Sequence, residues 1–202
     1  MPISRQSQWI LALVLIGLIG ACQPDEAPDY PKAPDRIEPL HVQDANAPLG
    51  APLRLDAAGV QVQRPAGWTA LDSMAALRAH RSVSVDTTVV QTKPLRVFGE
   101  QRTSSFLAIA RIRVNSGDIG SIIQHHLTAH NPDFLRVDTL QGEEQPLIDL
   151  VIASRSAVHH KVLMIGDADT TAVQFDFVTP RFQYPRIAPL IAASVASIRR
   201  AE

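Results

Sequence analysis

Apolar and polar residues alternate along several stretches of the chain, and this period of two predicts β-strands. Ser104 to Val114 is apolar on both faces for half its length, which favours a strand covered on both sides of a sheet. The last three candidates have short connections, so we expect antiparallel neighbours in a meander. The expected strands are Val60–Arg64, Ser104–Val114, Leu147–Ser154, Ala157–Ile165 and Thr171–Thr179, with β-rich pieces at Ser82–Val85 and Thr88–Val97.

Apolar positions spaced three and four residues apart predict three helices. Ala70 to His80 is weakly amphipathic, whereas Ile119 to His130 follows a polar break that offers capping side chains. The last helix is expected from Arg186 to Arg200 and should lie across the sheet. Pro189 is tolerable only in the first turn of that helix, and Arg199–Arg200 would suit the negative end of its dipole.

The first strand ends in Pro65-Ala66-Gly67-Trp68, a turn that we expect to direct the indole of Trp68 into the core. Strands and helices are interspersed with loops along residues 53–202, and no internal repeat is present. The pattern predicts one α+β domain in that range, with helices packed on a mainly antiparallel sheet.

A charged residue, an apolar run and a small-residue site open the chain. Arg5 precedes the run Trp9 to Ile19, which is too short to span a membrane comfortably, and Ile19-Gly20-Ala21-Cys22 follows. This resembles the lipobox of bacterial lipoproteins, and the resemblance implies that residues 1–21 are a signal peptide and that Cys22 carries acyl chains such as palmitate. The uncharged Gln23 after it resembles the default pattern for the outer membrane, with the protein facing the periplasm.

Residues 22–52 read as the lipidated cysteine followed by a spacer. Seven of the fifteen prolines of the chain lie in this stretch, interleaved with acidic residues. Proline removes backbone donors and holds the chain extended, so about thirty residues at ~3.1 Å each could place the domain up to ~90 Å from the lipid. The expected boundary of the folded domain is Leu53.

Composition excludes some classes of function. The chain has 202 residues, of which 46% are hydrophobic and 19% charged, and its net charge is −1. This balance leaves no basic footprint for nucleic acid, which we exclude as a partner. Because Cys22 is the only cysteine, an exported domain would have to be stable without disulfides, and a thiol nucleophile is excluded.

The order of these elements resembles the PsbP and DcrB-like proteins. The resemblance rests on a strand running into Pro65–Trp68, a central helix, an antiparallel meander, and a Phe-rich strand before a helix with Ser194 and Ser197, and it covers about Leu55 to Arg200. It implies an α-β-α sandwich around an antiparallel sheet and a non-enzymatic accessory or binding module, often lipid-anchored in bacteria. It supplies no catalytic residues, and the stretch Thr87–Arg102 has no clear counterpart in it.

Motifs for known chemistry are scarce. No Gly-x-Ser-x-Gly, phosphate-binding Gly-rich loop or dinucleotide fingerprint occurs, so no cofactor is expected. His126 and His130 have the spacing of two metal ligands on one helix face, yet a third ligand is not evident, so surface or core-edge histidines are the alternative. His159 and His160 would point to opposite faces of a strand.

Three functions remain open. The first is a lipid-anchored accessory or interaction module of the cell envelope without catalytic activity, attached to the membrane through Cys22 and contacting an envelope protein; it predicts an exposed apolar patch. The second is a periplasmic lipoprotein that binds a small molecule or metal, which a pocket lined by Trp68, or by His126 and His130, would favour. The third is a hydrolase without a recognisable motif, which needs a cleft of titratable groups.

Overall fold

We analysed a computed structural model, which describes residues 34–83, 90–100, 102–115, 120–121, 123–124, 134–166 and 170–201. The chain divides into two units, Met1–Pro31 and Lys32–Glu202, and the described residues all belong to the second. Among the described residues, no helix has both the length and the apolar character needed to cross a bilayer.

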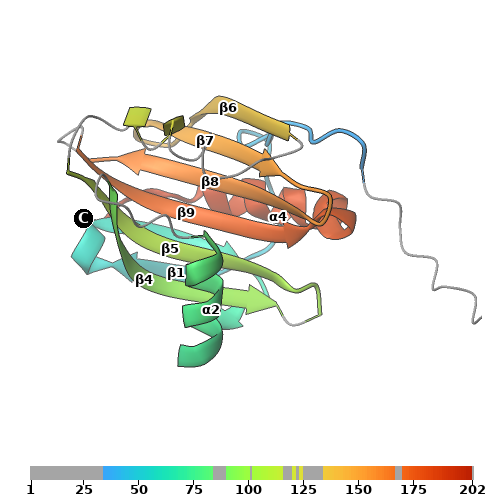
Figure 1. Cartoon of the computed structure of the whole chain (residues 1–202), viewed down its shortest axis with the longest axis horizontal. Helices are drawn as coiled ribbons and strands as arrows, with labels where there is room; N and C mark the ends of the chain where they lie inside the picture. Colours follow the sequence, from blue (N-terminus) through green and yellow to red (C-terminus); the bar gives the residue numbers. More distant parts are fainter. Residues whose placement is uncertain are drawn as a thin grey trace, which may run out of the picture. The chain divides into compact units, whose positions relative to one another are not determined.

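A seven-stranded sheet forms the centre of this unit (Figure 1). Its spatial order is β3-β4-β5-β9-β8-β7-β6, and every neighbouring pair is antiparallel. The expected meander is confirmed, because β7, β8 and β9 are consecutive neighbours. The strands are β3 (Thr69–Ala70), β4 (Val90–Glu100), β5 (Ser105–Val114), β6 (Phe134–Gln141), β7 (Pro146–Ala153), β8 (Ala157–Ile165) and β9 (Thr171–Pro180).

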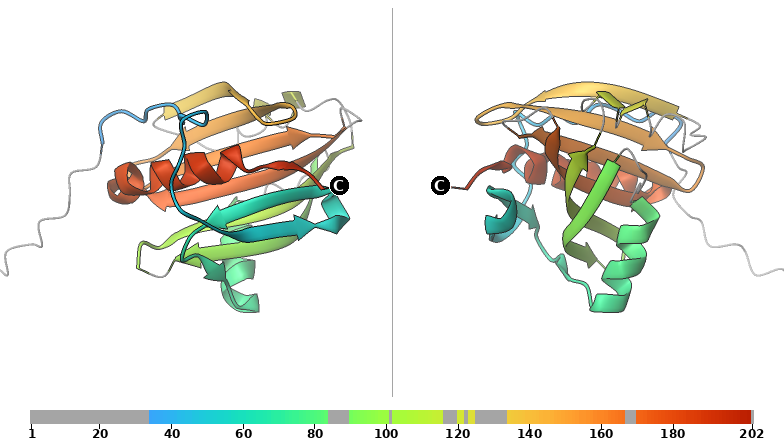
Figure 2. Two further views of the ribbon diagram at one scale, coloured as in Figure 1. Left: turned by 180° about the vertical axis from the view of Figure 1, so that it is seen from behind. Right: turned by 60° about the vertical axis from the view of Figure 1, so that its left-hand side comes forward.

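One face of this sheet is covered by a second sheet and a helix. The second sheet has the order β1-β2-β10, with β1 (Leu49–Leu55), β2 (Val60–Pro65) and β10 (Arg199–Arg200), and a short 3-10 helix η1 (Asp56–Ala58) joins β1 to β2. Helix α4 (Tyr184–Ala196) follows the 3-10 turn η2 (Arg181–Gln183). Figure 2 shows α4, β1 and β2 on one side of the large sheet and α2 (Ser73–Val83) on the other.

The main core lies between the large sheet and the layer of α4, β1 and β2. Its members include Val62 from β2, Phe175 and Phe177 from β9, and Ile191 from α4, each 0% exposed. Trp68 is 1% exposed and belongs to the same cluster, which confirms the expected inward indole. The turn before it depends on Gly67, whose φ of 84° lies in the left-handed region that side chains disfavour.

Helix α2 packs on the opposite face. Its first turn is capped by Asp72, whose Oδ1 accepts the backbone N–H groups of Met74 and Ala75 at 3.0 and 2.8 Å. The cap explains why the helix begins at Ser73, three residues later than expected from the apolar pattern. It continues to Val83, so the β-rich piece expected from Ser82 begins as helix instead.

The end of the chain differs from its prediction. Helix α4 ends at Ala196, and Arg199–Arg200 form strand β10, which pairs with Val60 and Gln61 of β2. The two arginines therefore do not cap a helix dipole. The helix also begins at Tyr184, so Pro189 lies inside it rather than in its first turn. Pairing with β2 makes these last residues a strand. The local sequence pattern does not indicate this pairing, because the partner strand lies far away in the sequence.

Residues 34–48, which we call the N-terminal strap, pack against the domain, whereas the sequence predicted an extended spacer there. Ile37, Leu40 and Val42 are 1%, 7% and 8% exposed and pack against the domain. Strand β1 then starts at Leu49, before the expected boundary at Leu53. The folded unit thus includes much of a Pro-rich stretch, because three buried apolar side chains at intervals attach it to the domain.

The fold class is α+β with mainly antiparallel sheets and, among the residues described, two long helices. Part of the helix expected at Ile119–His130 is described, and Gly120, Ser121, Ile123 and Gln124 are helical. The rest of that helix lies outside the described residues.

Candidate functional site

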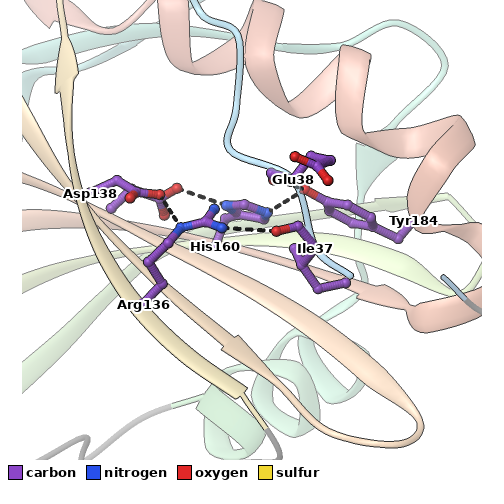
Figure 3. Close-up of polar contacts among 7 residues, drawn as sticks. Ile37, Glu38, Arg136, Asp138, His160 and Tyr184 are labelled. Carbon is purple, nitrogen blue, oxygen red and sulfur yellow. Dashed lines mark hydrogen bonds and ion pairs between the residues drawn. The ribbon is translucent and has the colours of Figure 1, made fainter. Parts of the chain in front are cut away.

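A chain of buried polar groups runs from the large sheet to the strap (Figure 3). His160 in β8 and Asp149 in β7 are both 0% exposed, and His160 Nδ1 lies 2.8 Å from Asp149 Oδ2. The other ring nitrogen, Nε2, lies 3.1 Å from the hydroxyl of Tyr184 at the start of α4. That hydroxyl in turn donates to the backbone carbonyl of Glu38 in the strap at 3.1 Å.

The direction of the hydrogen bond from Tyr184 defines part of this chain. Tyr184 has a single hydroxyl hydrogen, which it gives to Glu38, so its oxygen accepts from His160 Nε2. Nδ1 faces the carboxyl group of Asp149, so both ring nitrogens of His160 have a buried hydrogen-bond partner. Burial, and next the charge of Asp149, raises the pKa of Tyr184 above its usual 10.0, so the phenol stays protonated.

Arginine side chains hold the strap at further points. Arg136 of β6 donates from Nη1 to the carbonyl of Ile37 at 2.8 Å while its Nε contacts Asp138 Oδ2 at 2.6 Å (Figure 3). Arg181 donates from Nε to the carbonyl of Pro34 at 3.1 Å and from Nη2 to that of Asp35 at 3.4 Å. Charged donors thus satisfy the carbonyls of a segment that lacks regular secondary structure.

An apolar groove of about 380 Å³ lies between the strap and α4. Its floor is one face of α4, with Tyr184, Ala188 and Ala192 at intervals of four residues. Charged residues of the strap, including Glu38 and Asp44, stand among its lining. The volume is within the range of small-ligand pockets, and the lining has the usual apolar character with a few polar groups.

A second buried polar cluster lies on the other face of the sheet. Lys161 of β8 and Asp176 of β9 are register partners, are 1% and 0% exposed, and form an ion pair. His159 Nδ1 lies 3.6 Å from the second carboxylate oxygen. Burial alone would raise the pKa of Asp176. The positive charge of Lys161, and then the contact with His159, lower this pKa by more than burial raises it, to about 2. The carboxylate is therefore ionised throughout the neutral range.

An exposed apolar surface lies on α2. Met74 is 60% and Leu77 41% exposed, and the two side chains are one helical turn apart. Leu77 also lines a groove of about 330 Å³ between α2 and β4, together with Leu71, Ala76, Leu95 and Val97, among others. We call Met74, Leu77 and this groove the α2 surface.

The structure describes only some of the candidate residues that the sequence analysis named. Cys22, His126 and His130 lie outside the described residues. His159 and His160 face opposite sides of β8, as expected, and contact Asp176 and Asp149 respectively. Trp68 is a core residue and does not line any of the grooves described above. Within the described ranges, no group of three or more His, Cys, Asp or Glu side chains is arranged to hold a metal ion.

Sequence reasoning missed Asp149, Lys161, Asp176 and Tyr184. The sequence did contain an indication of two of these residues, because Asp176 lies between Phe175 and Phe177, and Lys161 lies within an apolar strand. A charged residue in such a strand is expensive to bury without a partner. The partners become apparent only when the register of β8 and β9 is known.

Comparison with known proteins finds likeness in structure. No protein-family model matches the chain, and no curated protein matches it. The crystal structure of the Ran-binding protein Mog1p from Saccharomyces cerevisiae superposes with a TM-score of 0.45 at 10% sequence identity. The match covers 78% of this chain and 97% of that one.

Proposed function

We propose that this protein is a lipid-anchored interaction module of the bacterial cell envelope, without catalytic activity. The lipobox-like Ile19-Gly20-Ala21-Cys22 supports attachment through acyl chains on Cys22, and Gln23 supports the outer membrane, facing the periplasm. Several acyl chains on one residue give more stable anchoring than a single chain. The likeness of the element order to PsbP and DcrB-like proteins also supports an accessory role within an α-β-α sandwich.

The observation that carries the proposal is the α2 surface. A tethered module that contacts a protein partner needs an exposed apolar patch, and large exposed side chains beside an apolar groove meet that need. Methionine suits such a surface because its flexible, polarisable side chain adapts to a partner. We place an apolar side chain of an envelope protein in the groove between Leu77 and Leu95.

The protonation states of the buried groups support a binding role over catalysis. A general acid or base works best with a pKa near the operating pH. The raised pKa of Tyr184 and the pKa of about 2 for Asp176 keep each group in one protonation state near neutrality. Both side chains are also buried and already hydrogen-bonded or ion-paired.

Site-specific photocrosslinking in living cells tests the partner contact. A photoreactive residue at position 77 should capture a discrete envelope protein, and Met74→Asp in the same chain should abolish the capture. The matched control is position 137, where Val137 on β6 is similarly exposed at 47%. Equal capture from positions 77 and 137, or capture insensitive to Met74→Asp, would refute the assignment of the α2 surface.

The anchor is tested separately by Cys22→Ala. We expect an unprocessed precursor that no longer fractionates with outer-membrane proteins and no longer incorporates labelled palmitate. A mature, membrane-bound Cys22→Ala protein would exclude the lipid anchor while leaving the photocrosslinking result to stand by itself.

The groove between the strap and α4 favours a second candidate function, the binding of a small apolar molecule. Its volume of about 380 Å³ and its floor of Tyr184, Ala188 and Ala192 support this. The fluorescent probe 1-anilinonaphthalene-8-sulfonate should bind the folded protein, and Ala188→Leu, which fills the groove, should weaken that binding. Unchanged binding in Ala188→Leu would reject the groove as the binding site.

A further inference from the structure

Three exposed cations lie together on neighbouring strands of the large sheet. Lys93 of β4 is the register partner of Arg111 in β5, and Arg113 is two residues further along the same face. They border a hollow of about 720 Å³ with Gln91, Thr92, Thr170 and Thr171. The hollow is at the end of the sheet where β4 and β9 begin and β5 ends, away from the start of the strap (Figure 1).

This arrangement is electrostatically unfavourable unless an anion joins it. Like charges directly opposite each other on antiparallel strands destabilise the pair. None of Lys93, Arg111 and Arg113 forms an ion pair with a carboxylate in the part of the chain that the structure describes. Arg111 donates from Nη1 to the carbonyl of Ala57 at 3.3 Å, which holds one side of its guanidinium beside the hollow. The net charge of the whole chain is −1, so the local excess of positive charge is a feature of this surface.

The chemistry of the lining selects the ligand. All seven lining residues are polar or charged, and the side chains supply guanidinium, ammonium, hydroxyl and amide donors. Guanidinium forks match the oxygens of phosphate groups, and lysine adds a point charge. A phosphate monoester carries close to two negative charges and a phosphodiester headgroup carries one, so either offsets part of the charge of the three cations. The volume exceeds that of an isolated phosphate and leaves room for the group that carries it.

We propose that Lys93, Arg111 and Arg113 form a binding site for the phosphate group of a ligand. The site is separate from the α2 surface and does not depend on the protein partner proposed above. The phosphate could belong to a soluble phosphate ester or to the headgroup of an anionic phospholipid, and the experiment distinguishes these two sources.

Calorimetric titration of the mature full-length protein in a neutral detergent tests the site. The probes are inorganic phosphate, short-chain phosphatidylglycerol and, as the zwitterionic reference with no net charge, short-chain phosphatidylcholine. We expect saturable binding of at least one phosphate-bearing anionic probe and none of phosphatidylcholine. Binding of inorganic phosphate indicates a soluble ester, whereas binding of phosphatidylglycerol alone indicates a lipid headgroup.

Variants decide whether the proposed residues are responsible. Arg111→Gln with Arg113→Gln should weaken binding about tenfold or more, because charge-assisted hydrogen bonds are lost. The matched control is Arg78→Gln with Arg81→Gln, which removes the same charge from exposed positions on α2 and should leave binding unchanged. An equal loss in the two double variants, or no binding of either anionic probe, overturns the proposal.

A stability measurement adds an independent readout. Lys93→Gln relieves the repulsion with Arg111 and leaves the bond from Arg111 to the Ala57 carbonyl in place, so this variant should melt at or above the temperature of the wild type. A clear fall in melting temperature would contradict the idea that these cations are held together against their repulsion, and would overturn the site.

Discussion

Replacing Lys161 by methionine tests the energetics of the buried ion pair directly. The substitution keeps the approximate length of the side chain and leaves Asp176, which is 0% exposed, without its main cation. Removing one partner of a buried pair typically costs about 3–5 kcal/mol, because the remaining charge is buried without compensation. A domain of this size is stable by roughly 5–15 kcal/mol, so Lys161→Met should fold but unfold at clearly lower urea concentration.

The free energy of unfolding should depend on pH through the ionisation of Asp176. The pKa of Asp176 falls from 3.8 to about 2 in the folded protein, so its ionised form contributes on the order of 2 kcal/mol of stability. That contribution is present above pH 3.8 and is lost as the pH falls towards 2. Without Lys161, burial dominates and raises the pKa of Asp176, so lowering the pH protonates it and relieves the penalty. The difference between wild type and Lys161→Met should therefore be smaller at about pH 4 than at about pH 7.

Urea unfolding followed by circular dichroism at the two pH values measures these free energies. Lys161→Met combined with Asp176→Leu should recover much of the loss, since an apolar pair can replace a buried ion pair. The matched control is Arg54→Met, because Arg54 and Asp56 form an exposed pair at 2.7 Å that should contribute about 1 kcal/mol or less. A loss below about 1 kcal/mol in Lys161→Met, or a loss that is equal at both pH values, would refute this account of the pair.

Three further substitutions test local features by thermal or urea unfolding. Tyr184→Phe leaves His160 Nε2 and the carbonyl of Glu38 without their partner and should cost about 1–3 kcal/mol, and an unchanged stability would show that water replaces the hydroxyl. Asp72→Ala removes the cap of α2 and should cost about 1 kcal/mol, whereas Asp72→Asn should retain most of it. Gly67→Ala places a side chain at a φ of 84° and should destabilise by roughly 1–2 kcal/mol, while a neutral result would mean that the turn relaxes.

Elements with a strong local pattern could be predicted from the sequence. The meander of β7, β8 and β9 consists of long apolar runs with turn residues between them, so its strands and their antiparallel order follow from residue types alone. Strand β5 was also recognisable, because its apolar residues on both faces require cover on both sides. The inward position of Trp68 followed from the turn before it.

Elements decided by distant contacts could not be predicted in this way. Arg199–Arg200 are polar and follow a helix, and only the unpaired edge of β2 makes them a strand. The strap is rich in proline and charge, and its attachment depends on three apolar side chains that pack against the domain. Lys161 and Asp176 are fifteen residues apart, and a shift of one residue in the register would put them on opposite faces.

The attachment of the strap determines how the domain would respond to mechanical load. The carbonyls of Pro34, Asp35, Ile37 and Glu38 are bonded one after another to Arg181, Arg136 and Tyr184. A pull on the chain before Pro34 would therefore load these bonds in sequence, as in peeling, and not all together as in shear. The strap would yield at low force while the antiparallel sheet stays intact, so the extended chain before the sheet would lengthen under tension before the domain unfolds.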